Sequence, residues 1–293
     1  MKILKDLDLN NVVFIDIETV AVVPKLLPNT PLYESWAYKV KYNKEKIEAG
    51  EKTYEQMYEE QAQLYPEFAK IVCITIGKIV NGILKLKSYS DHDETVLLKA
   101  FNKDMNNMLA ANKGIRLCGH FIVGFDIPFI LTRCMICQVE PCSLVDIAAQ
   151  KPWEVTAIDT QTLWKATSIR SASLINIAVA LGLDSPKDEM YGYETTKVYY
   201  ENPEGLARIT KYCEKDVLTT ANIVRKCRFE EIVSAETSEI KVEKVGTMQT
   251  IYNSKKITAA QEKEIIKTLE GMTGEDLNAA NTILKVVVPK KVK

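Results

Sequence analysis

Residues Val12-Val13-Phe14-Ile15-Asp16-Ile17-Glu18-Thr19 form an apolar run of β-branched and aromatic residues that is interrupted by two acids. Such a run is typical of a buried central strand. Asp16 and Glu18 stand two positions apart, so their side chains point to one face of the strand. Two carboxylates beside a core strand are costly unless a positive charge compensates them, and a divalent cation is the simplest candidate. Because Asp-x-Glu is also a common solvated tripeptide, the stretch by itself supports only a hypothesis.

The composition is that of an ordinary globular protein, with 46% hydrophobic and 26% charged residues in a chain of 293. The net charge of −1 counts against a protein that coats duplex DNA, but it permits an enzyme that grips a few nucleotides locally. No apolar run is long enough to span a bilayer, and the first ten residues carry acids where a secretory signal needs an apolar stretch. We therefore expect a cytoplasmic protein that makes no membrane contact.

Seven cysteines, odd in number and without a framework pattern, indicate free thiols. The close pair Cys134-x-x-Cys137, with Cys118 and His120 upstream, is compatible with a zinc site. The segments around these cysteines are apolar, however, and such cysteines usually pack in a core. Core packing is the favoured interpretation.

The hydrophobic pattern predicts five strands, at residues 12–17, 71–77, 83–89, 115–118 and 155–160. Asn81-Gly82 is a strong hairpin signal between the second and third strands. Helices are expected from about Glu94 to Lys113, from about Ile127, over 174–181 and over 203–228, with 184–200 a polar loop that could hold a short element. This order predicts an α/β fold, a mixed five-stranded sheet with helices on both faces.

Two regions stand apart from this pattern. Residues 20–66 form an insertion rich in Tyr, Lys and Glu, in which one or two mostly exposed amphipathic helices are expected before Pro66. After about residue 229 the periodicity fades, and two short helical patterns follow over 258–285 before a basic tail. We therefore predict a domain at 1–228 that contains the insertion 20–66, and a small, partly helical C-terminal appendage at 229–293.

Three motifs carry the candidate chemistry. Asp16 and Glu18 lie in FIDIET, Phe125-Asp126 ends GHFIVGFD after the fourth strand, and Tyr212 and Asp216 lie in YCEKD on one face of a helix. Together with the flanking segments LYPEFAKIVCITIG and LDSPKDEMYG, they resemble the DEDD superfamily of 3′–5′ exonucleases in its Tyr-containing (DEDDy) branch. The chain is similar to the proofreading exonuclease domains of family B DNA polymerases and their stand-alone relatives, over residues 10–228. This resemblance implies a ribonuclease H-like fold.

The resemblance also implies a two-metal mechanism with Mg²⁺ or Mn²⁺. Asp16 would bridge both ions, Glu18 and Asp216 would hold the ion that binds the attacking water, and Asp126 would hold the other. Tyr212 would hydrogen-bond that water, and orientation is favoured over base catalysis because an unperturbed tyrosine has a pKa near 10.

Substrate contacts implied by the same motifs involve Thr19, His120 and Phe125, although a buried, hydrogen-bonded histidine is an equally good interpretation of His120. Relatives commonly have Asn, a substrate-contacting residue, where this chain has Phe121. Phe121 could stack on a base, as aromatic residues do with single strands, or pack internally. Lys187 is a candidate phosphate contact, although most surface lysines have no specific role.

The leading hypothesis is a metal-dependent exonuclease that degrades single-stranded DNA from its 3′ end and releases nucleoside 5′-monophosphates. A non-catalytic nucleic-acid-binding or docking module, motivated by Phe121 and the slightly acidic net charge, and an RNA-trimming exonuclease are the alternatives. A polymerase or repair partner would have to be a separate protein, because the residues after 228 are too few for a polymerase domain.

Overall fold

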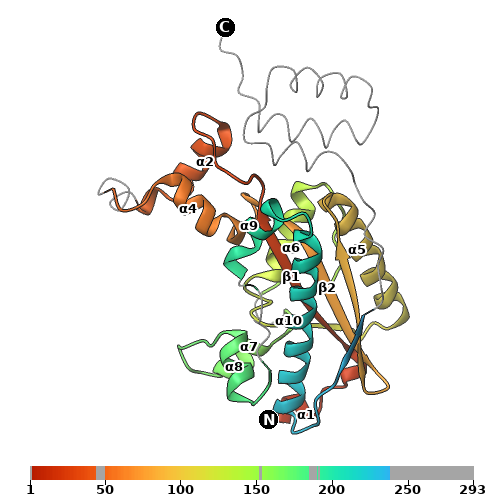
Figure 1. Ribbon diagram of the computed structural model, residues 1–293. Coiled ribbons are helices and arrows are strands. Elements are labelled where there is room, and N and C mark those ends of the chain that lie inside the picture. The colour runs from red at the N-terminus through yellow and green to blue at the C-terminus, as the bar shows by residue number, and fades with distance from the viewer. Residues whose placement is uncertain (1, 44–49, 152–153, 185–189, 191, 238–293) are drawn as a thin grey trace. The chain divides into compact units, whose positions relative to one another are not determined.

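The computed structural model describes residues 2–43, 50–151, 154–184, 190 and 192–237 (Figure 1). The chain divides into two units, one made of residues 1–20 and 63–243 and the other of residues 21–62 and 244–293. The predicted helices at 258–285 lie outside the described residues.

A six-stranded mixed sheet forms the centre of the first unit, in the order β5-β4-β1-β2-β3-β6. β1 is parallel to β4 and β4 to β5, β2 and β3 are antiparallel, and β3 is parallel to β6. The predicted α/β class is confirmed, and the predicted count of five strands is corrected by β6. The strands are β1 (Val12–Ala21), β2 (Ala69–Val80), β3 (Ile83–Ser90), β4 (Arg116–Gly119), β5 (Ile158–Asp159) and β6 (Ala235–Thr237).

The hairpin between β2 and β3 confirms the turn that Asn81-Gly82 predicts. Val80 pairs with Ile83 across a two-residue loop. Asn81 and Gly82 both have positive φ, 52° and 78°, as a type I′ turn requires. The long strands β2 and β3 are therefore held in register from the turn outward.

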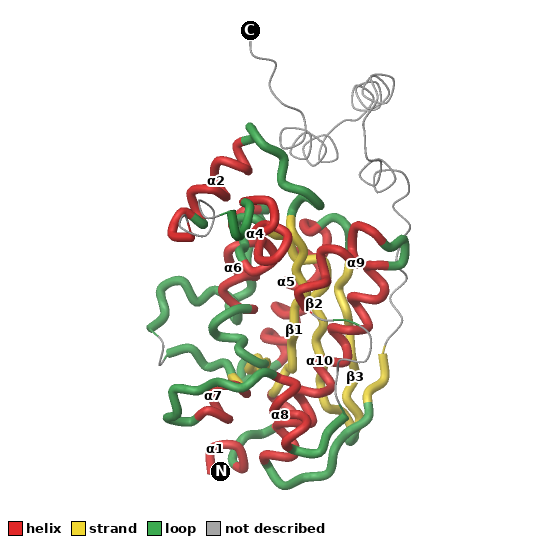
Figure 2. The backbone as a smooth tube through the Cα atoms, turned by 60° about the vertical axis from the view of Figure 1, so that its left-hand side comes forward, coloured by secondary structure: helices red, strands yellow, loops and turns green. Residues whose placement is uncertain are grey.

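The alternation of β1 divides the core between two layers of helices. Val13, Ile15 and Ile17 pack with residues of α5 (Glu94–Ala111) and α6 (Asp126–Ile136). Val12 and Phe14 face the other way, toward α10 (Gly205–Cys227), which crosses the opposite face of the sheet in Figures 1 and 2. The predicted cover of helices on both faces is confirmed.

The close packing of α10 on the sheet depends on Gly77 in β2. A Cβ atom at Gly77 would lie 2.9 Å from Cγ1 of Val217 and 3.0 Å from a methyl carbon of Leu84. Any side chain here would push α10 away from the sheet, and with it the residues that α10 presents toward β1.

The strand predicted at 155–160 is reduced to Ile158–Asp159, because Asp159 caps a helix that the sequence pattern did not reveal. The Asp159 carboxylate accepts hydrogen bonds from Gln161 N and Thr162 N at the start of α7. The remaining helices of this unit are short: α1 (Lys2–Lys5), α7 (Thr160–Lys165), α8 (Leu174–Ala180) and α9 (Thr195–Glu201), with 3₁₀ turns at Leu9–Asn11, Ala62–Leu64 and Gly192–Glu194.

In the insertion, where one or two helices were expected, the second unit holds α2 (Pro31–Lys39) and α4 (Tyr54–Gln61), besides a 3₁₀ turn at Lys41–Asn43. Trp36 and Tyr58 pack edge to face with their ring centroids 5.4 Å apart, and Trp36 Nε1 donates to Tyr54 O at 2.9 Å. Thr53 and Gln56 form a capping box at the start of α4. Local caps and the edge-to-face pairs Trp36–Tyr58 and Tyr33–Tyr54 thus define this small helical unit.

The predicted division after residue 228 stays a prediction, although the sheet itself includes Ala235–Thr237. Across the described part of the chain, no helix is long and apolar enough to cross a membrane.

Candidate active site

Strand β1 presents Asp16 and Glu18 on the face that α10 covers. Val12 and Phe14 point to this side from one end of the strand, and Val20 packs here near Tyr212 from the other. Asp16 is half-buried, while Glu18 is only 7% exposed. The alternation predicted from the sequence is therefore observed, and both carboxylates lie between the sheet and a helix.

Helix α10 brings Tyr212, Cys213 and Asp216 to the same place. The Tyr212 hydroxyl is hydrogen-bonded to the Asp216 carboxylate one turn further along the helix. The Cys213 thiol lies 3.4 Å from both the carbonyl oxygen and Oδ2 of Asp16 and donates toward them. The contacts of Cys213 thus tie the helix directly to the middle of β1.

Asp126 reaches the site from the first turn of α6, where the helix dipole favours a negative charge. Its carboxylate accepts hydrogen bonds from its own backbone N–H and from that of Ile17 in β1. Gly119, at the end of β4, allows the strands to approach closely, since a Cβ atom there would lie 2.9 Å from Ile15 O. The second motif is therefore anchored to β1 at a position between the two carboxylates of the first.

The pKa values of these carboxyl groups show the cost of their confinement. Burial, followed by repulsion from Asp216 and Asp126, raises the pKa of Asp16 well above its usual range. Burial, followed by repulsion from Asp16 and Asp216, does the same to the pKa of Glu18. Burial raises the pKa of Asp126 to about 7. Like charges held in a poorly solvated place disfavour ionisation.

No Lys or Arg side chain of the described residues forms an ion pair with Asp16, Glu18 or Asp126. Ligand atoms of Asp16, Glu18 and Cys213 lie within 4.8 Å of one another, a separation that suits a shared metal ion. Glu18 is nearly buried, and its carboxylate makes no hydrogen bond with any of the described residues. A buried set of hard oxygen ligands without a cationic partner fits divalent cations.

Cys213 is the residue at this site that the sequence reasoning missed. Burial and the nearby acidic groups raise the pKa of its thiol, so it remains a neutral hydrogen-bond donor to Asp16. The available signal was its place directly after Tyr212 and three residues before Asp216, which puts it on the inner side of the same helix.

The candidate substrate residues have different surroundings. Thr19 is buried, and its hydroxyl donates to Gln63 O at 2.7 Å, so that group is engaged inside the fold. Nδ1 of half-buried His120 lies 3.0 Å from Thr160 Oγ1, and burial lowers the pKa of the imidazole. Phe125 is partly buried, with its ring centroid 5.2 Å from that of Phe129. Phe121 is 47% exposed.

Lys187 lies outside the described residues, so its role as a phosphate contact stays a prediction. Asp159, at the end of β5, binds the loop that follows β4 as well as capping α7. Its carboxylate accepts from Phe121 N at 3.1 Å and from Val123 N at 3.3 Å.

The cysteines considered for zinc pack in the core. Cys118 and Cys134 are buried among apolar residues, and Cys137 lies 3.4 Å from a carboxylate oxygen of Glu94. Among the described residues, these thiols and His120 do not form a group spaced for a metal ion. The sequence interpretation that favoured core packing is confirmed.

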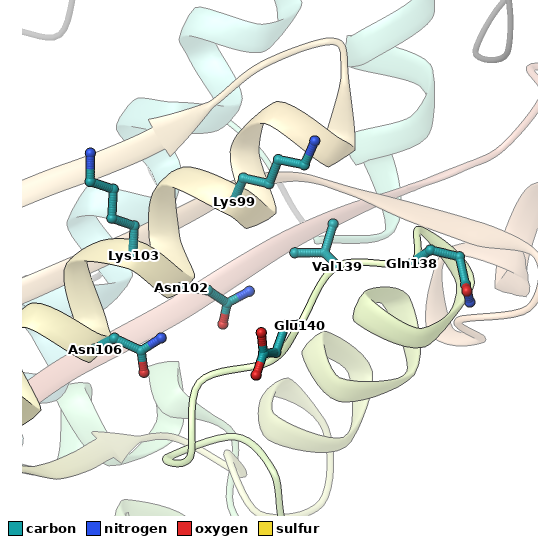
Figure 3. A pocket seen from close by; sticks show the side chains of 7 residues that line it. All are labelled: Lys99, Asn102, Lys103, Asn106, Gln138, Val139 and Glu140. Atoms are coloured by element: carbon teal, nitrogen blue, oxygen red, sulfur yellow. The ribbon is translucent and has the colours of Figure 1, made fainter. Parts of the chain in front are cut away.

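A polar hollow of about 250 Å³ lies elsewhere, between α5 and the segment that follows α6 (Figure 3). It contains none of the motif carboxylates. The amide of Asn102, one of its lining residues, is already engaged with Leu98 O, Cys134 Sγ and Cys142 N. The other lining residues are Lys99, Lys103, Asn106, Gln138, Val139 and Glu140.

A family model of the RNase H superfamily matches residues 60–228, more than half of the chain. The chain belongs to the RNase H superfamily. The matched range includes Asp126, Tyr212 and Asp216, while β1 with Asp16 and Glu18 precedes it. Membership of the RNase H superfamily supports a nuclease-type function.

A solved structure of the family B DNA polymerase from the hyperthermophilic archaeon Pyrobaculum calidifontis is similar, with 14% sequence identity and a TM-score of 0.47. The similarity covers 71% of this chain and 23% of the polymerase, so the RNase H superfamily protein corresponds to less than a quarter of that chain. No curated protein matches the sequence.

Proposed function

We propose that this RNase H superfamily protein is a metal-dependent 3′–5′ exonuclease of the Tyr-containing DEDD branch. It removes nucleoside 5′-monophosphates from the 3′ ends of single-stranded DNA. The proposal is supported by the contacts of Asp16, Glu18, Asp126, Asp216 and Tyr212. Ligand atoms of Asp16 and Glu18 lie within 4.8 Å of each other, Tyr212 is hydrogen-bonded to Asp216, and Asp126 accepts from Ile17 N in β1. The five residues come from three separate elements and influence one another electrostatically. Such a set is costly to bury and is explained by a ligand of opposite charge.

Asp16, Glu18, Asp126 and Asp216 would hold two divalent cations, for which Mg²⁺ and Mn²⁺ are the best candidates because every carboxylate ligand is a hard oxygen. Bound ions of this kind activate a water for attack on phosphorus and neutralise charge on the leaving oxygen. The two backbone N–H groups that bind the Asp126 carboxylate fix its orientation before any ion arrives.

Tyr212 acts in this proposal by orientation and not as a base. Burial, together with the carboxylates of Asp216, Glu18 and Asp16, raises the pKa of its phenol far above the usual range. The hydroxyl therefore keeps its proton at neutral pH, and its hydrogen bond with Asp216 holds the ring at the site. Because its single proton is donated to Asp216, the phenol oxygen can accept a hydrogen bond from the attacking water and so position it.

The decisive experiment follows a 5′-labelled single-stranded DNA oligonucleotide with purified protein and Mn²⁺. We expect a ladder that shortens from the 3′ end, with nucleoside 5′-monophosphates identified by chromatography. Asp16→Asn should abolish it, whereas Asp146→Asn, which changes an exposed acid outside the motifs, should not. An intact strand, or degradation that is equal in wild type and Asp16→Asn, would rule the proposal out.

The substrate class is tested in the same assay. A matched RNA strand, a DNA strand with a blocked 3′ terminus and a paired DNA end are compared with the single strand. We expect the free single-stranded DNA end to be degraded fastest, and the blocked terminus to resist. Faster degradation of RNA would move the proposal to RNA trimming while leaving the carboxylate chemistry unchanged.

A further inference from the structure

Phe121 has an unusual backbone conformation for an aromatic residue. Its φ is 59°, in the left-handed region that bulky side chains rarely adopt. At the same time its side chain is 47% exposed, although neighbouring Ile122 is completely buried. Phe229 combines exposure with a positive φ as well, so the role of Phe121 depends on its contacts and on its place in the turn before Asp126.

The surrounding contacts hold Phe121 in this conformation. The Asp159 carboxylate accepts from Phe121 N, and Phe121 O accepts from both Gly124 N and Phe125 N at 3.0 Å. Asp159 is itself fixed by the helix cap that it provides to α7. The loop between β4 and α6 is therefore a rigid turn with every backbone group of Phe121 engaged.

The phenyl ring rests on Gly124. A Cβ atom at Gly124 would lie 2.3 Å from Cε2 and 2.4 Å from Cζ of the ring. The ring can occupy this position only because residue 124 has no side chain. It is thus supported from one side by backbone while almost half of the side chain remains in contact with solvent.

The same turn carries the metal-binding candidate Asp126. Phe121 is bonded through its carbonyl to the N–H of Phe125, the residue before Asp126, and Ile127 N donates to Ile122 O at 3.0 Å. The exposed ring and the Asp126 carboxylate are consequently fixed to one short, hydrogen-bonded piece of backbone. The only residues between the exposed ring and the candidate metal ligand Asp126 are 122–125, in the same hydrogen-bonded turn.

We propose that Phe121 is a stacking platform for an unpaired base at the 3′ end of the substrate. This inference rests on the proposed function and specifies how the site selects single-stranded ends. Aromatic faces bind unpaired bases of any sequence, and a base in a duplex is already stacked on its neighbours. The preformed ring pays no ordering cost on binding. A purine, with its larger face, should bind better than a pyrimidine.

The test measures binding separately from cleavage. A single-stranded DNA oligonucleotide with 2-aminopurine as its 3′-terminal base is titrated in Ca²⁺, and electrophoresis verifies that the strand stays intact. Stacking on Phe121 should quench the fluorescence of the terminal base. We expect Phe121→Ala to abolish the quenching of 2-aminopurine fluorescence. It should also weaken binding of the strand about 5- to 150-fold, the range for loss of one base–aromatic stack.

Two further variants separate stacking from folding. Phe121→Asn removes the ring but suits a left-handed backbone, so it should fold well and also lose the quenching. Phe121→Trp should retain it. The matched control is Phe229→Ala, since Phe229 is also exposed and has a φ of 63° but lies at the end of α10. It should bind and quench like wild type.

A strand with an abasic 3′ terminus completes the cycle. Wild type should bind the abasic strand as weakly as Phe121→Ala binds the normal strand. Phe121→Ala should bind the abasic strand no more weakly than it binds the normal strand. Equal binding and equal quenching by wild type, Phe121→Ala and Phe121→Asn would overturn the stacking role. If these variants still cleave DNA in an Asp16-dependent manner, only this inference falls. If Phe121-dependent quenching is seen without any cleavage, the nuclease proposal falls instead.

Discussion

Glu94 and Glu18 are buried to nearly the same degree, 6% and 7% exposed, but their surroundings are opposite. Glu94 is bound by Arg133, whose Nε lies 2.9 and 3.1 Å from its two carboxylate oxygens, and it also accepts from Ile71 N at 2.7 Å. Glu18 has acidic neighbours and, among the described residues, no hydrogen-bond donor.

The difference separates a buried carboxylate that stabilises the fold through an ion pair from one that has no such partner among the described residues. The pair of Glu94 and Arg133 joins α5, α6 and the start of β2, and the second arm of the guanidinium donates to Pro66 O at 2.8 Å. All of its charge is compensated inside the chain. Glu18 has no ion-pair partner among the described residues, and in the proposed function bound cations compensate its charge, so stability and activity should respond differently to changes at the two places.

The largest effect is expected for Glu18→Gln on nuclease activity. Loss of one charged ligand should reduce the rate by about 10³- to 10⁴-fold, or roughly 4–5 kcal/mol of transition-state stabilisation. The free energy of unfolding of the metal-free protein should stay the same or rise, because a repelled carboxylate has been removed. Cleavage rates on labelled single-stranded DNA check the loss of activity, and urea unfolding in EDTA checks the stability of the metal-free protein. A clear loss of stability would mean that Glu18 has a partner within the fold.

Arg133→Met should lower the stability of the protein and leave its activity unchanged, the opposite of Glu18→Gln. Removal of the cation leaves Glu94 buried without compensation and should cost about 3–5 kcal/mol in the free energy of unfolding. The activity of the folded fraction should remain. Lys85→Met, in the exposed pair with Glu236, is the control and should cost less than about 1 kcal/mol. If Arg133→Met and Lys85→Met cost the same in urea titrations, the distinction between the two clusters is wrong.

Metal binding should stabilise the protein by a smaller amount. Free Mn²⁺ at 100 times its dissociation constant adds about 2.7 kcal/mol for one site that exists only in the folded state. Asp16→Asn should remove most of this gain. Arg133→Met should keep the gain, although its free energy of unfolding without metal is lower than that of wild type. Thermal unfolding at several Mn²⁺ concentrations gives both numbers. A shift of equal size in wild type and Asp16→Asn would place the ion elsewhere.

The smallest effect concerns Lys70, which lies near the paired cluster. Burial lowers the pKa of its ammonium group to about 8, although it donates to His92 O and to Tyr199 Oη. Between pH 8 and the unfolded value near 10.5 the unfolded chain binds more protons, so the free energy of unfolding should rise with pH.

After allowance for partial solvent screening, we expect a rise of about 1–2 kcal/mol across that interval. Below pH 8 the cost of the buried charge is fully present. Lys70→Met should flatten this part of the profile, and urea unfolding between pH 7 and 10 measures it. An equal slope in wild type and Lys70→Met would assign the pH dependence to other groups.

The sequence was sufficient for the features that depend on local periodicity. Alternation along β1 placed Asp16 and Glu18 on one face, and helical spacing placed Tyr212 and Asp216 together. The Asn81-Gly82 hairpin followed from turn chemistry alone. The relative placement of three motifs also needed the resemblance to a known family, because periodicity does not specify which elements meet.

Features that depend on contacts between distant segments were missed or only partly predicted. Strand β6 is three residues long and has no hydrophobic alternation, so only its pairing with β3 defines it. The hydrogen bonds that Asp159 accepts from Phe121 N and Val123 N could not be predicted, because the partners lie nearly 40 positions apart in the sequence. The strained conformation of Phe121 follows from those bonds and was equally inaccessible.

The short outer strands of the sheet have a consequence for solubility during folding. An exposed strand edge is a template on which another chain can assemble, and β3 would present such an edge at Leu84–Leu86. β6 covers these residues, Ser234 O accepts from Leu84 N at 2.9 Å, and Glu236 forms an ion pair with Lys85. The opposite border, β5, is only two residues long. β6 occupies the edge of β3 at Leu84–Leu86, and a chain cut before Ala235 would lose this protection against self-association there.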